Sequence, residues 1–574
     1  MPGRAETGKR PAGRKAEAAA RILGLVAACV FLPAVAISKQ STPQTLRVTT
    51  RLVVVNVVAH NEKGEPVKDL SRGDFTILDD GKPQQISVFS VERREVKHAS
   101  VKPLPPNVFS NRIARDGSVP ANVAAILFDG ADTSFADSSF ARSELAKFIR
   151  QMPLGESVAL YVLGPRGLSI VQDFTSDPSP LLEAIRGLRG YAGAESASPD
   201  EGDDLSIPQM SARDALNSIM PDMDHRPKPG EIDPSRIMSG LEAVKAIASR
   251  LSGLPGRKSL IWVTDHVPYP GPQSFANLGA VLAYEGNISA QEQKLRKVIR
   301  ALNQDDVAVY PVDAHGLVVG PLNKGLYASS QGLPPPIWPG EVWVLDMDYW
   351  AHHTGGRAFY FTNGLDQAIH KALDDSEVTY TLGYYPNGLA WNGEYRHIKV
   401  RVDRKGVHLR YRQGYYASTG AENLRAKPVN LLAAAAASPL DSTGLGVTVR
   451  LTRRGQPPSL RLKAAIYVDG RGLTFQPEHG RYDVSFMVWA GQYSKQGRQL
   501  AAKSKKVSFK LSPANYHAAL KGGLGLTVQE TLKPGAWKLG VSVLDTASGT
   551  TGSVRIPLHR QSGLGGDSRK QAVE

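Results

Sequence analysis

The sequence predicts an α/β domain with a doubly wound, mostly parallel sheet, flanked by a small N-terminal β module and a C-terminal β-sandwich. Two apolar runs, NVAAILFD at 122–129 and SLIWVTD at 259–265, each end on an aspartate, as expected of buried strands that deliver side chains to the crest of a sheet. Segments with helical periodicity separate the apolar runs. Because these runs do not alternate with polar residues, we expect helices on both faces of the sheet.

Residues 1–36 have the composition of an export signal. Six Lys or Arg residues precede an apolar run from Ile22 to Ile37, and Ala34-Val35-Ala36 fits the small-x-small pattern of a cleavage site. We expect a signal peptide cleaved after Ala36. The alternatives are an uncleaved N-terminal anchor, with membrane association, and a lipid on Cys29, the single cysteine. The expected location is the periplasm, the cell envelope or the extracellular space.

Length and charge restrict the classes of function. A chain of 574 residues should divide into about three or four domains. The formal net charge is +15, and about +11 remains beyond residue 36. The basic residues are dispersed rather than gathered in one stripe, which indicates a solvated surface. Without a nucleic-acid-binding motif, we expect no nucleic-acid partner.

A small all-β module is expected over residues 45–98. LRVTTRLVVVNVVAHN alternates apolar and polar residues, and the next alternating stretch, DFTILDDGKPQQISVFSVE, has Asp80-Gly81 at its centre, a strong hairpin signal. The segment that follows, residues 101–120, is rich in Pro, Ser and Asn and predicts a linker.

The α/β domain is expected over residues 121–385, with a loop insertion at 190–234. Asp177 and Ser179 can cap the second helix. The expected strands are NVAAILFD, SVALYVLG, LSIVQDF, SLIWVTD, VAVYPVDA, RAFYF and TYTLGYYP. The expected helices are about 136–151, PLLEAIRGL, GLEAVKAIASRL, about 290–302, a short segment before Gly355 and GLDQAIHKALDDS.

The remaining chain is predicted to be largely β. Residues 386–418 alternate around Arg404-Lys405-Gly406 and predict a β-hairpin extension. After a linker that contains the alanine run 433–437, short alternating strands over 444–560 predict a β-sandwich. Residues 562–574 are expected to be a disordered tail.

Several of these segments together resemble the bacterial exported VWFA-related domain proteins. The resemblance covers about residues 45–418. It rests on DFTILDDGKPQ, FDGADTSFAD, LPGRKSLIWVTD, VAVYPVDAHGL and TGGRAFYFTNGLDQAIHKALDDSEVTYTLGYYP. It implies a von Willebrand factor A fold and an interaction role.

The resemblance also implies a place for a metal ion. In an intact adhesion site of this family, D-x-S-x-S, a later Thr and a T-D-G aspartate surround a divalent cation. Asp129, Thr133 and Asp265 match three of these positions and are the candidate metal ligands. Ala131 cannot bind a metal, and His266 replaces the usual glycine.

This candidate site is therefore degenerate. Asp132 could supply an oxygen in place of the missing hydroxyl, and Ser196 and Ser198 are the only candidates for the later Thr. Two carboxylates and one hydroxyl predict weak binding of Mg²⁺ or another divalent cation, or none. The alternative is a metal-free crest in which Asp129 and Asp265 cap the loops that follow them.

No catalytic set competes with a binding role. The adjacent His352 and His353 do not share a helix face, and Asp313 and His315 lack a placed nucleophile. We therefore expect an exported, non-enzymatic protein-interaction protein that needs no cofactor and binds another envelope or extracellular protein independently of metal. The alternatives are a hydrolase acting on envelope polymer through crest carboxylates, and a purely structural spacer.

Overall fold

The computed structural model describes most of the chain between Leu52 and Leu558. The predicted signal peptide or anchor, almost all of the 190–234 insertion and the 562–574 tail lie outside the described residues. No helix in the described part of the chain has the length and apolarity needed to cross a membrane. The described ranges are 52–93, 104–113, 122–188, 234–268, 292–317, 339–417 and 427–558, with short gaps at 131–132, 134, 154–155, 165–166, 255, 376, 388–390 and 456–459.

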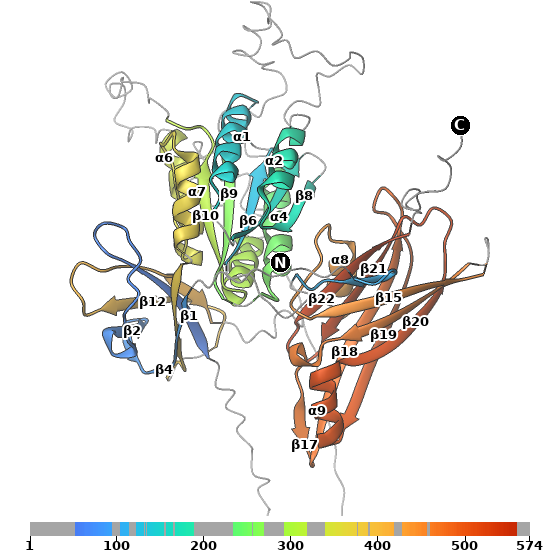
Figure 1. The fold of residues 1–574 in the computed structure, drawn as a ribbon. Helices are drawn as coiled ribbons and strands as arrows, with labels where there is room; N and C mark the ends of the chain where they lie inside the picture. Colours follow the sequence, from blue (N-terminus) through green and yellow to red (C-terminus); the bar gives the residue numbers. More distant parts are fainter. Residues whose placement is uncertain are drawn as a thin grey trace, which may run out of the picture. The chain divides into compact units, whose positions relative to one another are not determined.

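Five strands form the sheet of the α/β domain, in the order β10-β9-β6-β7-β8 (Figure 1). Four of them are parallel neighbours, and β8 is antiparallel to β7. The chain moves from β6 to one side through β7 and β8 and then returns to the other side through β9, so the strand order reverses between β6 and β9. Open α/β sheets bind ligands at such a point. The strands are β6 (Asn122–Asp129), β7 (Glu156–Gly164), β8 (Gly167–Thr175), β9 (Lys258–Thr264) and β10 (Val307–Asp313).

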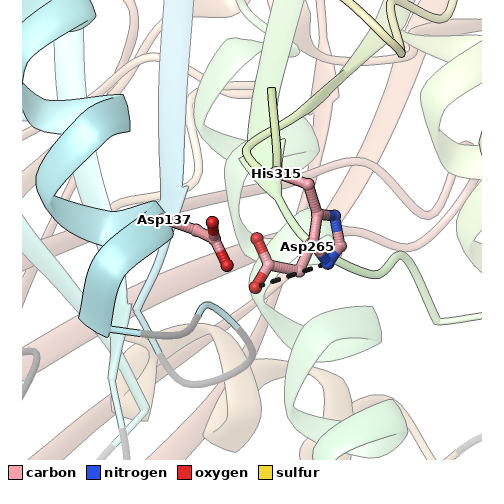
Figure 2. A group of neighbouring side chains, drawn as sticks. All are labelled: Asp137, Asp265 and His315. Carbon is pink, nitrogen blue, oxygen red and sulfur yellow. Dashed lines mark ion pairs between the residues drawn. The ribbon is translucent and has the colours of Figure 1, made fainter. Parts of the chain in front are cut away.

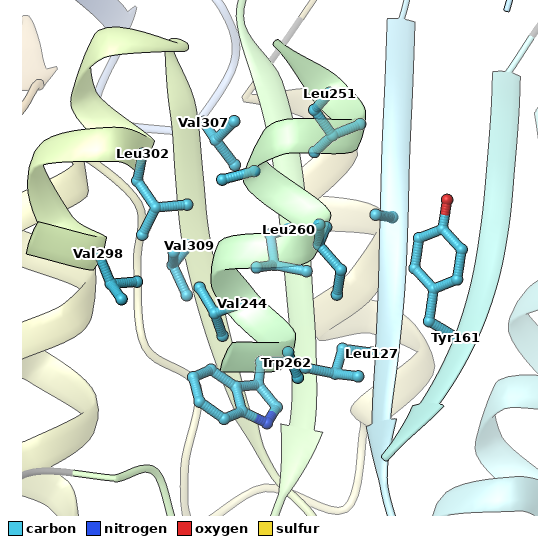
Figure 3. Close-up of a cluster of buried hydrophobic side chains, with 14 of the residues drawn as sticks. Leu127, Tyr161, Val244, Leu251, Leu260, Trp262, Val298, Leu302, Val307 and Val309 are labelled. Atoms are coloured by element: carbon cyan, nitrogen blue, oxygen red, sulfur yellow. The ribbon is translucent and has the colours of Figure 1, made fainter. Parts of the chain in front are cut away.

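Helices cover both faces of this sheet. Alternate residues of one strand therefore pack into two different clusters of buried side chains, one on each face. Leu127 of β6 belongs to a cluster with side chains of α4, among them Val244, and of α6 and the helical residues 292–304. Trp262 of the adjoining strand β9 belongs to the same cluster (Figure 3). Phe128 packs instead with side chains of α1, α2 and α7. The predicted doubly wound, mostly parallel sheet is confirmed. The helices are α1 (Phe135–Arg150), α2 (Pro178–Gly187), α4 (Pro234–Leu251), α6 (Pro339–Thr354) and α7 (Leu365–Asp374).

Local signals explain where individual helices begin. The Asp177 carboxylate accepts the Ser179 amide hydrogen at 2.9 Å and caps α2, as the sequence predicts. The helix before Gly355 is α6, and its sixteen residues make it longer than expected.

Two expected strands of this domain are different in the structure. The RAFYF segment makes a single bridge, Phe359 with Val312, because Phe361 has a φ of +54° that ends the extended backbone. The strand TYTLGYYP is β11 (Val378–Tyr384), and it leaves this sheet to pair with β1 (Val53–His60) and β4 (Ile86–Arg93).

The N-terminal β module is therefore not self-contained within residues 45–98. Its two antiparallel sheets have the orders β13-β1-β11-β4 and β14-β12-β2-β3, and they share one cluster of buried side chains that includes Val55, Ile77, Tyr380 and Val400. Each sheet combines strands from before and after the α/β domain, because β1 and β2 need hydrogen-bond partners at both edges. The further strands are β2 (Phe75–Asp79), β3 (Lys82–Gln84), β12 (Tyr395–Val402), β13 (His408–Arg410) and β14 (Gly414–Tyr416), and a 3-10 turn, η1, covers Arg72–Asp74.

The two turn predictions in this module have different outcomes. Asp80 and Gly81 have positive φ angles of 46° and 78° and connect the paired strands β2 and β3, as expected of an Asp-Gly turn. Within the expected hairpin region 386–418, β12 pairs antiparallel with β14. The strands that directly flank the predicted turn, β12 and β13, do not pair with each other, because β12 pairs with β2 and β13 with β1 in a different sheet.

Residues 427–558, together with strand β5 (Val108–Ser110), form two more antiparallel sheets, in the orders β20-β16-β15-β5 and β17-β18-β21-β22, with β19 paired to β18. One cluster of buried side chains includes Ile466 from the first sheet and Phe486 from the second. The elements are β15 (Val447–Arg454), β16 (Arg461–Val468), η5 (Gly470–Gly472), β17 (Gln476–Glu478), β18 (Arg481–Tyr493), β19 (Gln499–Leu511), α9 (Pro513–Gly522), β20 (Leu524–Thr531), β21 (Lys538–Asp545) and β22 (Thr551–Pro557).

Both linkers expected from the sequence contribute to this part of the fold. Strand β5 (Val108–Ser110), from the segment 101–120, pairs with β15. The alanine run lies in helix α8 (Pro428–Ala437), where Leu432 packs with Trp489 and Tyr493. A short edge strand and an alanine-rich helix acquire their stability from these distant partners, which local composition does not reveal.

Candidate functional site at the sheet crest

Asp129 is the last residue of β6 and is fully buried. Its Oδ2 accepts a hydrogen bond from Nε1 of Trp262, on the neighbouring strand β9, at 3.4 Å. The hydroxyl of Thr133 donates to the backbone carbonyl of Asp129, so this hydroxyl stabilises the loop that follows β6. Ala131, Asp132, Ser196 and Ser198 lie outside the described residues.

Asp265 directly follows β9 and takes part in a different group. Its carboxylate lies close to the carboxylate of Asp137 and the imidazole of His315, with one potential ligand atom of each within 4.8 Å of the others (Figure 2). Asp137 belongs to the first turn of α1, and His315 follows β10. Three segments far apart in the sequence thus converge at the carboxyl ends of the parallel strands, where the topology predicts a ligand site.

The imidazole of His315 lies between carboxylates. Its Nδ1 is 2.6 Å from Oδ1 of Asp313, and its Nε2 is 3.9 Å from Oδ2 of Asp265. The backbone amide of His315 also donates to Oδ1 of Asp313, at 3.0 Å, which holds the loop in place. A neutral imidazole has one N–H donor and an imidazolium has two, so two facing carboxylates favour the protonated ring.

The balance of forces on His315 also favours its charged form. Burial by itself would lower the pKa of His315, but the hydrogen bond to Asp313 and the charges of Asp265, Asp313 and Asp137 together raise this pKa above its usual value. The ring of His266 packs edge-on against the His315 ring, with 5.7 Å between the centroids. The carboxylates at the crest therefore raise the pKa of a hydrogen-bonded histidine.

The residues at the crest do not fit the ion of an adhesion site well. Of the predicted ligands, Asp265 groups with Asp137 and His315, and the hydroxyl of Thr133 donates to the backbone carbonyl of Asp129. Two carboxylates and an imidazole suit a transition metal better than Mg²⁺, which prefers oxygen ligands. The raised pKa of His315 also disfavours metal binding, because the imidazole must lose a proton before it can bind a metal. Weak Mg²⁺ binding at Asp129, Thr133 and Asp265 stays a prediction.

From the sequence, His315 is recognisable only as a residue that lacks a placed nucleophile. Asp137 is not among the residues that the sequence predicts at the site. A signal for Asp137 was present, because it lies in the first turn of the helix that follows the strand ending at Asp129. In a strand-loop-helix unit at the edge of a parallel sheet, that turn faces the crest. His352 and His353 lie in the last turn of α6 and are not members of this group.

Comparisons with known proteins add little to this picture. No family model matches the chain, and no curated protein matches it. The chain is similar to the solved structure of an aerotolerance-related membrane protein from Bacteroides fragilis, with 15% identity over 44% of this chain and 98% of that chain, and a TM-score of 0.21. The other similar structures include the SpRpn10 VWA domain (9% identity, 44% and 96% coverage, TM-score 0.19) and the minor pilin PilB from Streptococcus sanguinis (10%, 46% and 61%, 0.22). Likenesses this weak transfer no function.

The substitution His315→Gln is expected to remove a pH-dependent part of the stability. Because the pKa of His315 is raised in the folded protein, the imidazolium stabilises the fold fully below the unfolded pKa of about 6.5, and this contribution is lost as pH rises through the folded pKa. Chemical unfolding of both proteins at about pH 5.5 and about pH 9 measures the effect. The wild type should exceed the variant in stability more at the lower pH, and a difference that does not change with pH would contradict the expectation.

Proposed function

We propose that residues 122–375 form a von Willebrand A-like domain that binds another protein, without catalysing a reaction, through the crest of its sheet. One observation carries the proposal: Asp137, Asp265 and His315 come from three separate segments and meet at the carboxyl ends of the parallel strands. The doubly wound topology and the reversal of strand order between β6 and β9 support the same location.

In this proposal the crest works without a metal ion. The imidazolium of His315, close to Asp313 and Asp265, supplies positive charge at a place where a cation would otherwise be needed. Three carboxylates and one imidazolium leave this part of the crest negative. A partner that presents a Lys or Arg side chain would be electrostatically complementary, and its binding should weaken as salt increases.

The proposed location is the periplasm, the cell envelope or the extracellular space. The support is the sequence of residues 1–36, with its basic start, its apolar run and its Ala34-Val35-Ala36 end. The proposed partner is accordingly an envelope or extracellular protein, with association of the N-terminus with a membrane as the alternative to cleavage.

Capture of the partner by crest variants tests the proposal. The exported protein is immobilised, exposed to envelope extract of its source cells, and compared with Asp137→Asn and His315→Gln variants whose folding is checked by circular dichroism. Asp137 and His315 are both partly exposed, so these changes should leave the core intact. His517→Gln, at an exposed position of α9, is the matched control.

A protein captured by the wild type and by His517→Gln, but lost from both crest variants, is the expected result. If both folded crest variants retain every protein that the wild type captures, the crest is not the binding face.

A further inference from the structure

A cavity of about 730 Å³ lies away from the crest, bounded by α6, α7, the segment 356–362 and residues 409–413. Its size is within the range of small-molecule sites, about 300 to 1,000 Å³. None of the crest residues Asp137, Asp265 and His315 lines it. The cavity is therefore a candidate binding site separate from the crest.

Two glycines at the end of α6 allow the walls of the cavity to come together. A Cβ on Gly356 would lie 1.9 Å from the backbone oxygen of Val309 in β10, so only glycine fits this position. Gly355 has a φ of +82°, and a Cβ there would lie 2.7 Å from the backbone nitrogen of Arg412. Backbone atoms thus fix the segment that carries Arg357 between β10 and residues 411–412.

The lining of the cavity carries an excess of positive charge. Arg357, Lys371 and Arg410 line it together with His352, whereas Asp348 is the one carboxylate among its described lining residues. Arg410 is held by a buried carboxylate, because its Nη1 is 2.5 and 2.6 Å from the two oxygens of Asp375. This ion pair holds one guanidinium in place at the cavity.

Arg357 differs from Arg410 in having no carboxylate partner among the described residues. Within the part of the chain that the structure describes, it has no ion pair, and its guanidinium lies over the ring of Phe359 at 5.0 Å from the centroid. Partial burial, followed by repulsion from Arg410, lowers the pKa of Arg357. Two guanidinium groups that repel each other at the edge of one cavity would both be stabilised by an anion between them.

The start of helix α7 adds further attraction for an anion. Gly364, the N-cap residue, has no side chain that caps the helix, and the Asp366 carboxylate accepts a hydrogen bond from the backbone of Gln367. Gly364, Gln367 and Ala368 all line the cavity. The carboxylate in the first turn of α7, Asp366, does not line the cavity and is paired with Lys147 at 2.9 Å. The positive end of the helix dipole is therefore directed at a cavity that already carries cations.

The rest of the wall is apolar and aromatic. Phe359, Leu409 and Tyr411 line the cavity beside the charged groups. Such a mixture of a charged end and an apolar wall suits an organic molecule with one anionic group rather than a bare inorganic ion.

We propose that this cavity binds a small organic phosphate. A phosphate monoester carries about −1.5 to −2 charges near neutral pH and offers three acceptor oxygens, which matches a lining with more cations than anions. A sulfonate of the same shape carries a single charge and should bind less well. The organic part of the ligand lies against Phe359, Leu409 and Tyr411.

Titration calorimetry of the full chain with three probes tests the chemical class. Phenyl phosphate has both features of the proposed ligand, inorganic phosphate lacks the organic part, and benzenesulfonate lacks the second charge. We expect phenyl phosphate to bind more tightly than either of the others. Equal affinity for benzenesulfonate, or no binding of phenyl phosphate at millimolar concentration, would overturn the proposal.

Variants at the lining test the location. Arg357→Gln should weaken phenyl phosphate binding by about tenfold or more, and Lys371→Gln by several-fold, because each removes a charge-assisted contact. Asp348→Asn removes the opposing carboxylate and should strengthen binding. The control is Arg450→Gln, an exposed position on β15 that loses the same charge elsewhere.

Unchanged affinity in Arg450→Gln, with opposite changes in Arg357→Gln and Asp348→Asn, is the expected pattern. Unchanged binding in both Arg357→Gln and Lys371→Gln would place the phosphate elsewhere. Thermal unfolding of each variant checks that it is folded. We expect the variants at Arg357 and Lys371 to fold, because both residues are exposed.

Discussion

Replacing Asp375 with alanine is expected to lower the free energy of unfolding by about 3 to 5 kcal/mol, the usual cost of breaking a buried ion pair on one side. Asp375 is 2% exposed and connects α7 to the β module, with His60 of β1 at 3.2 Å and Arg410 of β13 at 2.5 Å. Its loss would leave the buried His60 and the half-buried Arg410 without this carboxylate. Chemical unfolding of the full chain measures the loss, and Asp403→Ala, at an exposed position of the same module, is the control.

The penalty of Asp375→Ala should depend on pH in a defined direction. Burial alone would raise the pKa of Asp375, but the hydrogen bond from His60 and the charges of Arg410, His60 and Arg257 outweigh burial and lower this pKa. A lowered pKa means that the ionised carboxylate stabilises the fold above the unfolded pKa of about 3.9 and loses this contribution as pH falls through the folded value. The two proteins should therefore become similar in stability in strong acid. A gap of constant size down to that pH would show that the ion pair is not its cause.

Asn111→Ala is expected to cost about 3 kcal/mol or more, because three backbone groups each lose a buried hydrogen bond to the Asn111 side chain. The Asn111 side chain donates to the carbonyls of Ser442 and Leu445 at 2.6 and 2.7 Å and accepts the amide hydrogen of Val447 at 2.8 Å. Asn111 is 1% exposed. The loss should appear as a lower urea midpoint of the full chain.

Two companion variants identify the cause of this loss. Asn111→Asp keeps the size of the side chain but places a carboxylate against two carbonyls, so it should be no more stable than Asn111→Ala. Ser110→Ala removes half-buried hydrogen bonds of the neighbouring residue and should cost only about 1 kcal/mol. If Asn111→Asp were as stable as the wild type, the two carbonyl contacts would have no role.

Much of the α/β domain can be predicted from the sequence because its information is local. Each buried strand is a short apolar run, and each amphipathic helix repeats its apolar residues at helical spacing. The two aspartates of the crest are recognisable for the same reason, because Asp129 ends one apolar strand and Asp265 follows another. Strand ends in a parallel sheet converge, so local information suffices there.

Strand partners cannot be predicted in this way. The alternation in β1 identifies its buried face, but nothing near it indicates that Val53 pairs with Tyr384, more than three hundred residues away. Asn111 lies in a segment whose composition predicts a linker, and its hydrogen bonds are made to residues 442–447. Side chains that act through such distant contacts are invisible to local patterns.

In the candidate site too, local patterns identify some residues, whereas others depend on the tertiary fold. Thr133 matches a ligand position in the sequence, yet in the fold its hydroxyl donates to the Asp129 carbonyl. Asp137 and His315 join Asp265 because of the rotation of α1 and the path of the loop after β10, which a motif does not encode. The cavity beside α7 likewise combines Arg357, expected in a regular strand, with Arg410 from another module.

Metal independence of the crest is tested most directly by the dissociation constant of the captured partner, measured by calorimetry in excess Mg²⁺ and again in excess chelator. Because the His315 imidazolium lies between Asp313 and Asp265, we expect the same dissociation constant under both conditions, and weaker binding in high salt. Partner binding that is abolished by the chelator and restored by Mg²⁺ would contradict a crest that works without a metal ion.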